Sequence, residues 1–240
     1  MHLLQVKGLS KTYGKKHVVR DLSLYVTTGE IVGLLGPNGA GKTTTFYMIV
    51  GIIRPEQGSI LLDSEDITQL PMYRRAMMGI NYLPQEPSIF RKLTVEDNLR
   101  AVLEIKGLGK EEIAVNIERL LQEFNLREFS KRNSYGLSGG ERRRTEIARA
   151  IAINPTFILF DEPFAGIDPL GIIELKMMLN YLKDKGIGIL ITDHNVRDTL
   201  SITDRTYIIS NGKIFEEGTP DKLAASQRVK DAYLGKEFTL

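Results

Sequence analysis

The sequence predicts an α/β fold with a mostly parallel, covered sheet. Apolar runs of strand length alternate with stretches of helical periodicity along most of the chain. This alternation is typical of parallel strands that are joined by crossover helices. The 240 residues, of which 42% are hydrophobic, suffice for one large domain with a packed core, or for a domain that carries a subdomain.

A glycine-rich segment, residues 36–45, reads GPNGAGKTTT. It contains the phosphate-loop pattern G-x-x-x-x-G-K-[ST] at Gly36, Gly41, Lys42 and Thr43. Glycines let the backbone N–H groups approach phosphate closely, because a Cβ would hold the phosphates away. The segment therefore predicts a site for a nucleoside triphosphate, with Lys42 at the terminal phosphates and the Thr43 hydroxyl as a ligand of Mg²⁺.

The segments on both sides of the loop support this interpretation. Residues 30–35 form an apolar run that predicts a buried strand, and residues 44–53 predict a helix that Pro55 ends. The N-terminus of a helix after such a loop favours anions. A chance match in an ordinary strand-to-helix turn is the alternative, which this context disfavours.

Other elements follow from apolar periodicity and turn residues. Two N-terminal strands are predicted at residues 3–6 and 17–26, with Tyr13 between them, and Asn211-Gly212 predicts a hairpin turn. The remaining predicted strands are 58–62, 80–83, 157–160, 188–192, 207–210 and 213–215. The remaining predicted helices are 72–78, two within 95–129 that are broken at 107–109, then 142–153 and 220–234.

Two carboxylates end the apolar strand at residues 157–160. Asp161 stands where Mg²⁺ beside a phosphate loop needs an acidic ligand. Glu162 comes next, and strand geometry predicts that it points the other way, where it can deprotonate an attacking water. Two solvated acids at a strand end are the alternative, which the phosphate loop makes less favoured.

A second anion site is predicted at the start of the helix near residue 142. Ser138 and Glu141 have the spacing of a capping box, and Gly139 and Gly140 lie between them. A plain helix cap is the alternative. The three adjacent arginines at 142–144 point in different directions on a helix, which predicts a solvated face rather than a nucleic-acid patch.

The bulk composition narrows the function classes. The net charge is +2, and there are no cysteines, which excludes disulfides and thiolate metal sites and is compatible with a reducing cytosol. No signal peptide is apparent at the N-terminus, and no apolar run approaches the ~18 residues that span a membrane. A membrane role would therefore need another chain.

Taken together, these motifs resemble the ATP-binding subunit of ABC transporters. Residues 36–44 match Walker A, Asp161 and Glu162 match the end of Walker B, and residues 137–141 match the ABC signature. The order and the spacing agree over nearly the whole chain.

Single positions extend the resemblance. Gln85 matches the glutamine at the boundary of the helical subdomain, His194 the switch histidine, and Tyr13 the aromatic residue that stacks on adenine. Residues 165–168 stand at the D-loop, where Ala165-Gly166 replaces the commoner serine-alanine start.

The resemblance implies a set of functional residues. ATP would be held by Tyr13, Gly36, Pro37, Asn38, Gly39, Ala40, Gly41, Lys42, Thr43 and Thr44, and by Ser138, Gly139 and Gly140 of a second copy. Mg²⁺ would be held by Thr43, Gln85 and Asp161, and the catalytic residues would be Glu162, His194 and Gln85.

The resemblance also implies a P-loop NTPase fold of the ABC ATPase type. Residues 1–85 and 155–240 would form a RecA-like core with an antiparallel β subdomain, and residues 86–154 a helical subdomain that carries the signature. The whole chain, 1–240, would be one ABC ATPase domain. It would work as a homodimer that sandwiches two ATP molecules head to tail.

Partners and location follow from the same resemblance. Two integral membrane subunits would dock near Gln85 and Phe90, on the cytoplasmic face of the inner membrane, although Phe90 could equally belong to the local core. Neither nucleic acid nor direct contact with the transported substrate is expected.

Three stretches indicate the group within the family. Residues 192–200 (TDHNVRDTL) and 233–240 (YLGKEFTL) closely resemble the ATPase of lipopolysaccharide export transporters, and residues 84–90 are consistent with it. The ATPase of branched-chain amino-acid importers is the alternative.

A non-transport ABC protein is a rival from another class. Translation factors of this kind carry two such domains, and repair types insert a long coiled coil where residues 46–136 are too short for one. A regulatory, non-catalytic module is disfavoured because Glu162 and His194 are both present.

Overall fold

The structure is a computed structural model that describes residues 1–235 and 238. The chain divides into two compact units: unit 1 contains residues 1–82 and the described residues from 156 onward, and unit 2 contains residues 83–155. Four residues of the ending that supported the narrower resemblance, 236, 237, 239 and 240, lie outside the described residues.

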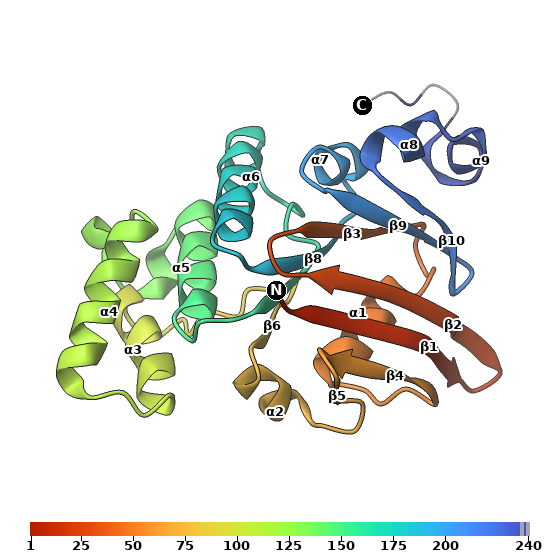
Figure 1. Cartoon of the computed structure of the whole chain (residues 1–240). Helices are drawn as coiled ribbons and strands as arrows, with labels where there is room; N and C mark the ends of the chain where they lie inside the picture. Colours follow the sequence, from red (N-terminus) through yellow and green to blue (C-terminus); the bar gives the residue numbers. More distant parts are fainter. Residues whose placement is uncertain (236–237, 239–240) are drawn as a thin grey trace. The chain divides into compact units, whose positions relative to one another are not determined.

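Most of the elements are labelled in Figure 1. The strands are β1 (Leu3–Tyr13), β2 (Lys16–Thr27), β3 (Ile31–Leu35), β4 (Gln57–Leu62), β5 (Glu65–Asp66), β6 (Ile80–Leu83), β7 (Phe157–Asp161), β8 (Gly188–Thr192), β9 (Arg205–Ser210) and β10 (Lys213–Gly218). The α-helices are α1 (Lys42–Val50), α2 (Met72–Met77), α3 (Val95–Ile105), α4 (Lys110–Glu123), α5 (Gly139–Ile151), α6 (Pro169–Asp184), α7 (Val196–Leu200), α8 (Pro220–Ala225) and α9 (Gln227–Val229). Short 3₁₀ turns are η1 (Arg127–Phe129) and η2 (Ser134–Gly136), and a π turn is η3 (Lys230–Leu234).

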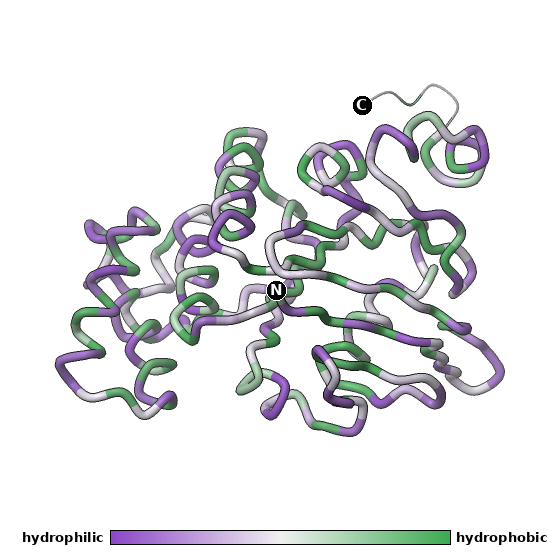
Figure 2. Tube along the Cα trace, in the orientation of Figure 1, coloured by the Kyte–Doolittle hydropathy of each residue, from purple (hydrophilic) through white to green (hydrophobic). Residues whose placement is uncertain are grey.

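Two sheets organise unit 1. The larger has the strand order β10-β9-β3-β8-β7-β6, and β3 pairs in parallel with β8 and β9, as β7 does with β8. The smaller sheet, β2-β1-β4-β5, is antiparallel. All residues of β3, β7 and β8 are buried, and Figure 2 shows these central strands as largely hydrophobic. The prediction of a mostly parallel, covered sheet is confirmed.

The first helix differs from its predicted bounds. It starts at Lys42 and ends at Val50, whereas residues 44–53 were expected to be helical. Gly51 stops it, not Pro55: this glycine adopts φ 85°, and its N–H donates to the carbonyl of Tyr47 at 3.1 Å. A glycine in the left-handed region is a common helix terminator, and here it acts before the proline is reached.

Residues 220–234 are helical as expected, apart from one break at Ser226 that divides the segment into α8, α9 and η3. Ser226 is extended, and its hydroxyl accepts from the N–H of Val229, which starts a new turn.

The expectation about the arginines at 142–144 is wrong, because they do not form a solvated face. All three are only partly exposed, and the Arg143 guanidinium, in a side chain that is 12% exposed, lies 3.2 Å from the carboxylate of Glu146.

Unit 2 is helical, as its periodicity predicts. Helices α3, α4 and α5 pack around buried apolar residues that include Leu99, Leu103, Ile117 and Leu120. Thr94 caps α3 by accepting from the N–H of Asp97 at 3.0 Å. The break between α3 and α4 falls within residues 106–109, close to its predicted place.

Candidate nucleotide-binding site

At two positions of the phosphate loop only glycine fits, because backbone atoms of neighbouring strands leave no room for a Cβ. A Cβ on Gly36 would lie 2.1 Å from the backbone oxygen of Ile209 in β9, and one on Gly41 would lie 2.7 Å from that of Val18 in β2. Gly41 also adopts φ 110°, which favours glycine. The two glycines therefore allow the loop to pack closely against β9 and β2. This reason for the glycines cannot be read from the sequence pattern alone.

Lys42 is the first residue of α1, directly after Gly41 of the loop. Its ammonium donates to the carbonyl of Gly36 at 2.8 Å and to that of Pro37 at 3.2 Å. Burial lowers the pKa of Lys42, and nearby carboxylates, first Glu162 and then Asp161, act in the opposite direction. The crest of the loop, residues 37–39, is exposed, as is Thr43 on the first turn of α1. An ammonium and open backbone N–H groups at a helix start suit phosphate.

Asp161 is the last residue of β7, and only 4% of it is exposed. Burial raises the pKa of its carboxyl, and a hydrogen bond from the hydroxyl of Tyr82 to Oδ2, at 2.9 Å, acts against that increase. Asp161 therefore places a buried carboxylate close to Lys42, at the strand end where the sequence predicts a ligand of Mg²⁺.

Glu162 does not continue the strand, in contrast to the prediction. Its φ is 48°, in the left-handed region, and its N–H donates to the carbonyl of Thr192 at 2.7 Å. This turn brings its Oε1 to 2.6 Å from Nε2 of His194, which follows β8. The carboxylate side chain is 13% exposed and the imidazole 50%. The ends of the neighbouring strands β7 and β8 thus bring Glu162 and His194 into contact.

Asp193 was missed by the sequence reasoning. It is 2% exposed, and its carboxylate accepts from the N–H of Phe164 and from that of Asn195, each at 2.8 Å. Burial raises the pKa of this carboxyl. Asp193 thereby ties the turn that carries His194 to the segment after Glu162. In the sequence, only its position directly before His194, at the end of a predicted strand, could have indicated that Asp193 belongs to the site.

Of the other predicted residues, Tyr13 lies in unit 1, and Gln85 and Ser138 lie in unit 2. Tyr13, at the end of β1, is 50% exposed, and the ammonium of Lys11 lies 5.7 Å from its ring centroid. In unit 2, Gln85 is exposed, and Ser138 caps α5 in a capping box with Glu141, as predicted.

The start of α5 is open to a ligand. A Cβ built on Gly139 or Gly140 would meet nothing within 4 Å, so the backbone at this helix start is uncovered.

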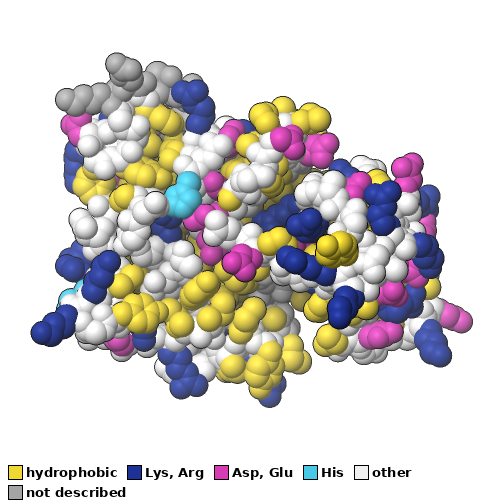
Figure 3. Space-filling model, turned by 180° about the vertical axis from the view of Figure 1, so that it is seen from behind, with side chains coloured by type: hydrophobic (Ala, Val, Ile, Leu, Met, Phe, Trp, Pro, Cys, Tyr) yellow, Lys and Arg dark blue, Asp and Glu magenta, His cyan; other side chains and the backbone are white. Residues whose placement is uncertain are grey.

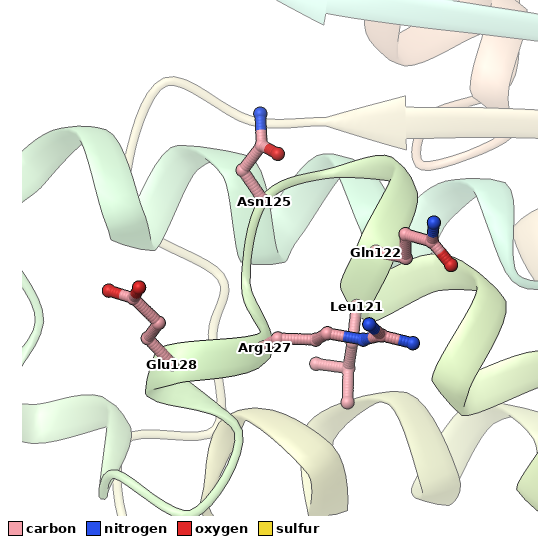
Figure 4. Close-up of a pocket in the computed structure, with 5 residues that line it drawn as sticks. All are labelled: Leu121, Gln122, Asn125, Arg127 and Glu128. Carbon is pink, nitrogen blue, oxygen red and sulfur yellow. The ribbon is translucent and has the colours of Figure 1, made fainter.

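A different feature of unit 2 is a small cavity of about 310 Å³ (Figure 4), which is lined by Leu121, Gln122, Asn125, Arg127 and Glu128. The Arg127 guanidinium is paired with Glu118. None of the predicted site residues lines this cavity.

A phosphate loop beside carboxylates at parallel strand ends defines the class of P-loop NTPases. The family model described as "ABC transporter" matches residues 19–165, which is more than half of the chain. The chain therefore belongs to the ABC transporter ATP-binding family, and it is a nucleotide-binding ATPase subunit of the kind that works as a dimer with membrane subunits. The family resemblance drawn from the sequence is confirmed.

Individual relatives are similar over the full length. The lipopolysaccharide export system ATP-binding protein LptB of Haemophilus influenzae is 54% identical, and its namesake in Escherichia coli K12 is 53% identical, each covering 100% of both chains. A probable ABC transporter ATP-binding protein of Azorhizobium caulinodans is 56% identical over 97% of this chain and 83% of its own. Among solved structures, the ATP-binding cassette MJ1267 in its ADP conformation has a TM-score of 0.86 at 28% identity, covering 98% of this chain and 100% of its own.

In the part of the chain that the structure describes, no helix combines the length and the apolarity needed to cross a membrane.

Proposed function

We propose that this protein is the ATPase of a lipopolysaccharide export transporter. It would work at the cytoplasmic face of the inner membrane and drive partner membrane subunits. The observation that carries the catalytic part is the contact of Glu162 with His194 beside Lys42 and Asp161. The cargo is inferred from the relatives named for lipopolysaccharide export, which match this chain from end to end.

The residues fit Mg²⁺ as a companion of ATP. Mg²⁺ prefers oxygen ligands and keeps waters and phosphates around it, so it needs few protein side chains. Asp161 offers a buried carboxylate and Thr43 an exposed hydroxyl, and Gln85 would add an amide oxygen. Among the described residues, no group of three or more acidic, histidine or cysteine side chains is arranged so that it could hold a metal ion. When bound, the ion neutralises phosphate charge.

Hydrolysis would be catalysed by residues of the phosphate loop and of the strand ends beside it, with Tyr13 holding the adenine. Lys42 and the loop N–H groups bind the phosphates, and Tyr13 stacks on adenine. Glu162 accepts a proton from the attacking water, a contribution of about 10²–10⁴-fold in rate for general bases. His194, now against Glu162, would contact the γ-phosphate.

The uncovered start of α5 would cap the nucleotide of a second copy. If so, two defective variants should complement each other: Ser138→Arg spoils the signature, and Lys42→Ala spoils the phosphate loop. Each alone should hydrolyse almost no ATP. An equal mixture should recover about a quarter of the parental activity, because half of the dimers are mixed and each has one intact site. No recovery in a mixture shown by mass analysis to exchange subunits would mean that each copy completes its own site.

Phe90 is the proposed contact for the membrane subunits. Its ring is 48% exposed and so lies outside the core, while Asn98, which is fully buried, holds its backbone through bonds of 2.9 Å and 3.1 Å. The Arg149 guanidinium lies 4.8 Å from the ring centroid. Figure 3 shows that hydrophobic side chains reach the surface at several places. A fixed, half-exposed aromatic ring is the kind of anchor that dominates interfaces.

We expect Phe90→Ala to weaken binding of the membrane subunits by about 2 kcal/mol, roughly 30-fold. Pull-down with the tagged chain measures this, and Ile105→Ala is the matched control, because Ile105 is 86% exposed elsewhere in unit 2. The urea midpoint of the isolated chain should be the same in both variants. A lower midpoint for Phe90→Ala would assign the residue to the core instead.

The transport assignment is tested by the partners and the phenotype. The tagged chain should co-purify two membrane subunits, and its depletion should leave lipopolysaccharide in the inner membrane. Co-purification of amino-acid permeases, with normal lipopolysaccharide export on depletion, would overturn the assignment.

A further inference from the structure

Tyr82 connects the two elements that carry the proposed magnesium ligands of unit 1. It lies on β6, the edge strand beside β7, and its hydroxyl donates to Oδ2 of Asp161 at 2.9 Å. Its ring meets that of Tyr47, on α1, edge-on, with the centroids 6.2 Å apart and the planes at 89°. Helix α1 also carries Thr43.

We propose that Tyr82 is a positioning residue for Mg²⁺, which holds one oxygen of Asp161 so that the other is presented to the ion. This rests on the proposed function. A free carboxylate rotates about its last bond, whereas one with a fixed hydrogen bond keeps its second oxygen in one direction. Partners of this kind raise metal affinity without touching the metal.

The hydrogen bond has a fixed polarity. The Tyr82 phenol carries a proton that it can donate, whereas an ionised carboxylate can only accept, so the bond runs from the Tyr82 hydroxyl to Oδ2 of Asp161. The acceptor is the carboxylate, and a hydrogen bond to an ionised acceptor is stronger than one between neutral groups.

The ring contact adds a second constraint. Because Tyr82 rests edge-on against Tyr47, a shift of α1 relative to β7 would disturb either the ring contact or the hydrogen bond. Tyr82 therefore sets the position of Asp161 relative to the helix that carries Thr43. Neither contact involves the phosphate loop directly, so ATP binding in the absence of a divalent ion should not depend on the Tyr82 hydroxyl.

The test is Tyr82→Phe, which keeps the ring and removes only the hydroxyl. Tyr73→Phe is the matched control, since Tyr73 is 62% exposed on α2. Mn²⁺ is the probe, titrated by electron paramagnetic resonance into protein bound to a β,γ-imido analogue of ATP. We expect the Mn²⁺ affinity to fall about 10-fold in Tyr82→Phe and to stay parental in Tyr73→Phe. Affinity for the analogue in EDTA should be parental in both.

A double variant separates positioning from a general structural effect. In an Asp161→Asn background, Tyr82→Phe should cause no further loss of Mn²⁺ affinity, because its effect passes through that carboxylate. Equal Mn²⁺ affinity in the parental protein and Tyr82→Phe would overturn the inference and leave the proposed function standing. The inference would also be overturned if Tyr82→Phe lowered the Mn²⁺ affinity further in the Asp161→Asn background. Weaker binding of the ATP analogue by Tyr82→Phe in EDTA would overturn it too. If the parental protein with the analogue binds no Mn²⁺ at all, the proposed function fails first.

Discussion

Replacing Glu162 by glutamine is expected to lower the kcat for ATP hydrolysis at least about 100-fold and to leave ATP binding intact. The amide has the shape of the carboxylate but cannot accept the proton of the attacking water. The backbone should not move, because the left-handed turn is held by the bond from the Glu162 N–H to Thr192. The variant should therefore hold ATP and remain as a closed dimer.

Three measurements check this result. Phosphate release gives kcat, a fluorescent ATP analogue gives affinity, and size-exclusion chromatography with ATP gives the dimer. Glu65→Gln, at an exposed position on β5, removes one carboxylate elsewhere and should retain parental kcat. Hydrolysis by Glu162→Gln at the parental rate would show that another group is the base.

The contact between Glu162 and His194 makes this variant informative about a second residue. Both Glu162 and His194 carry an atom that could accept the proton of water, and these two atoms lie 2.6 Å apart. A neutral amide at 162 can still bond the imidazole. A loss of turnover with an unchanged nucleotide affinity would thus assign the base role to the carboxylate rather than to the histidine.

Local signals made much of the fold predictable. The strands β3, β7 and β8 are short, wholly buried apolar runs, and the loop at 36–43 has a fixed spacing between a strand and a helix. The cap at Ser138 was equally visible, because a capping box lies within four consecutive residues. Each of these features depends on residues that are close together in the sequence, and each was predicted.

The missed features depend on contacts between residues far apart in the chain. Tyr82 meets Asp161 across 79 residues, and no motif marks a tyrosine in a strand as the partner of a carboxylate. The turn at Glu162 arises because the carbonyl of Thr192, on the next strand, takes its N–H. Such pairings exist only once the sheet is assembled, and a single sequence does not specify them.

Arg75 is the strongest case of a contact that the sequence conceals. It looks like one of two surface arginines in the short helix α2, yet only 1% of it is exposed. Its guanidinium donates to four carbonyls, those of Met48 at 2.7 Å, Ile49 at 2.6 Å, Thr68 at 2.8 Å and Leu70 at 2.9 Å. Burial lowers the pKa of Arg75 to about 10. This cation therefore binds carbonyls at the end of α1, the helix that begins at the phosphate loop.

Arg75→Met is accordingly expected to lower the free energy of unfolding by about 3–5 kcal/mol, since methionine fills a similar volume but leaves buried carbonyls without donors. Arg74→Met is the matched control: Arg74 is exposed beside it and should cost less than about 0.5 kcal/mol. Arg75→Lys should fall between the two, because an ammonium cannot reproduce the planar fork that spans four acceptors. The midpoints of urea unfolding measure all three. If Arg75→Met unfolds at the same urea concentration as Arg74→Met, the carbonyls of α1 find other donors, and the arginine is not what holds the end of the phosphate-loop helix.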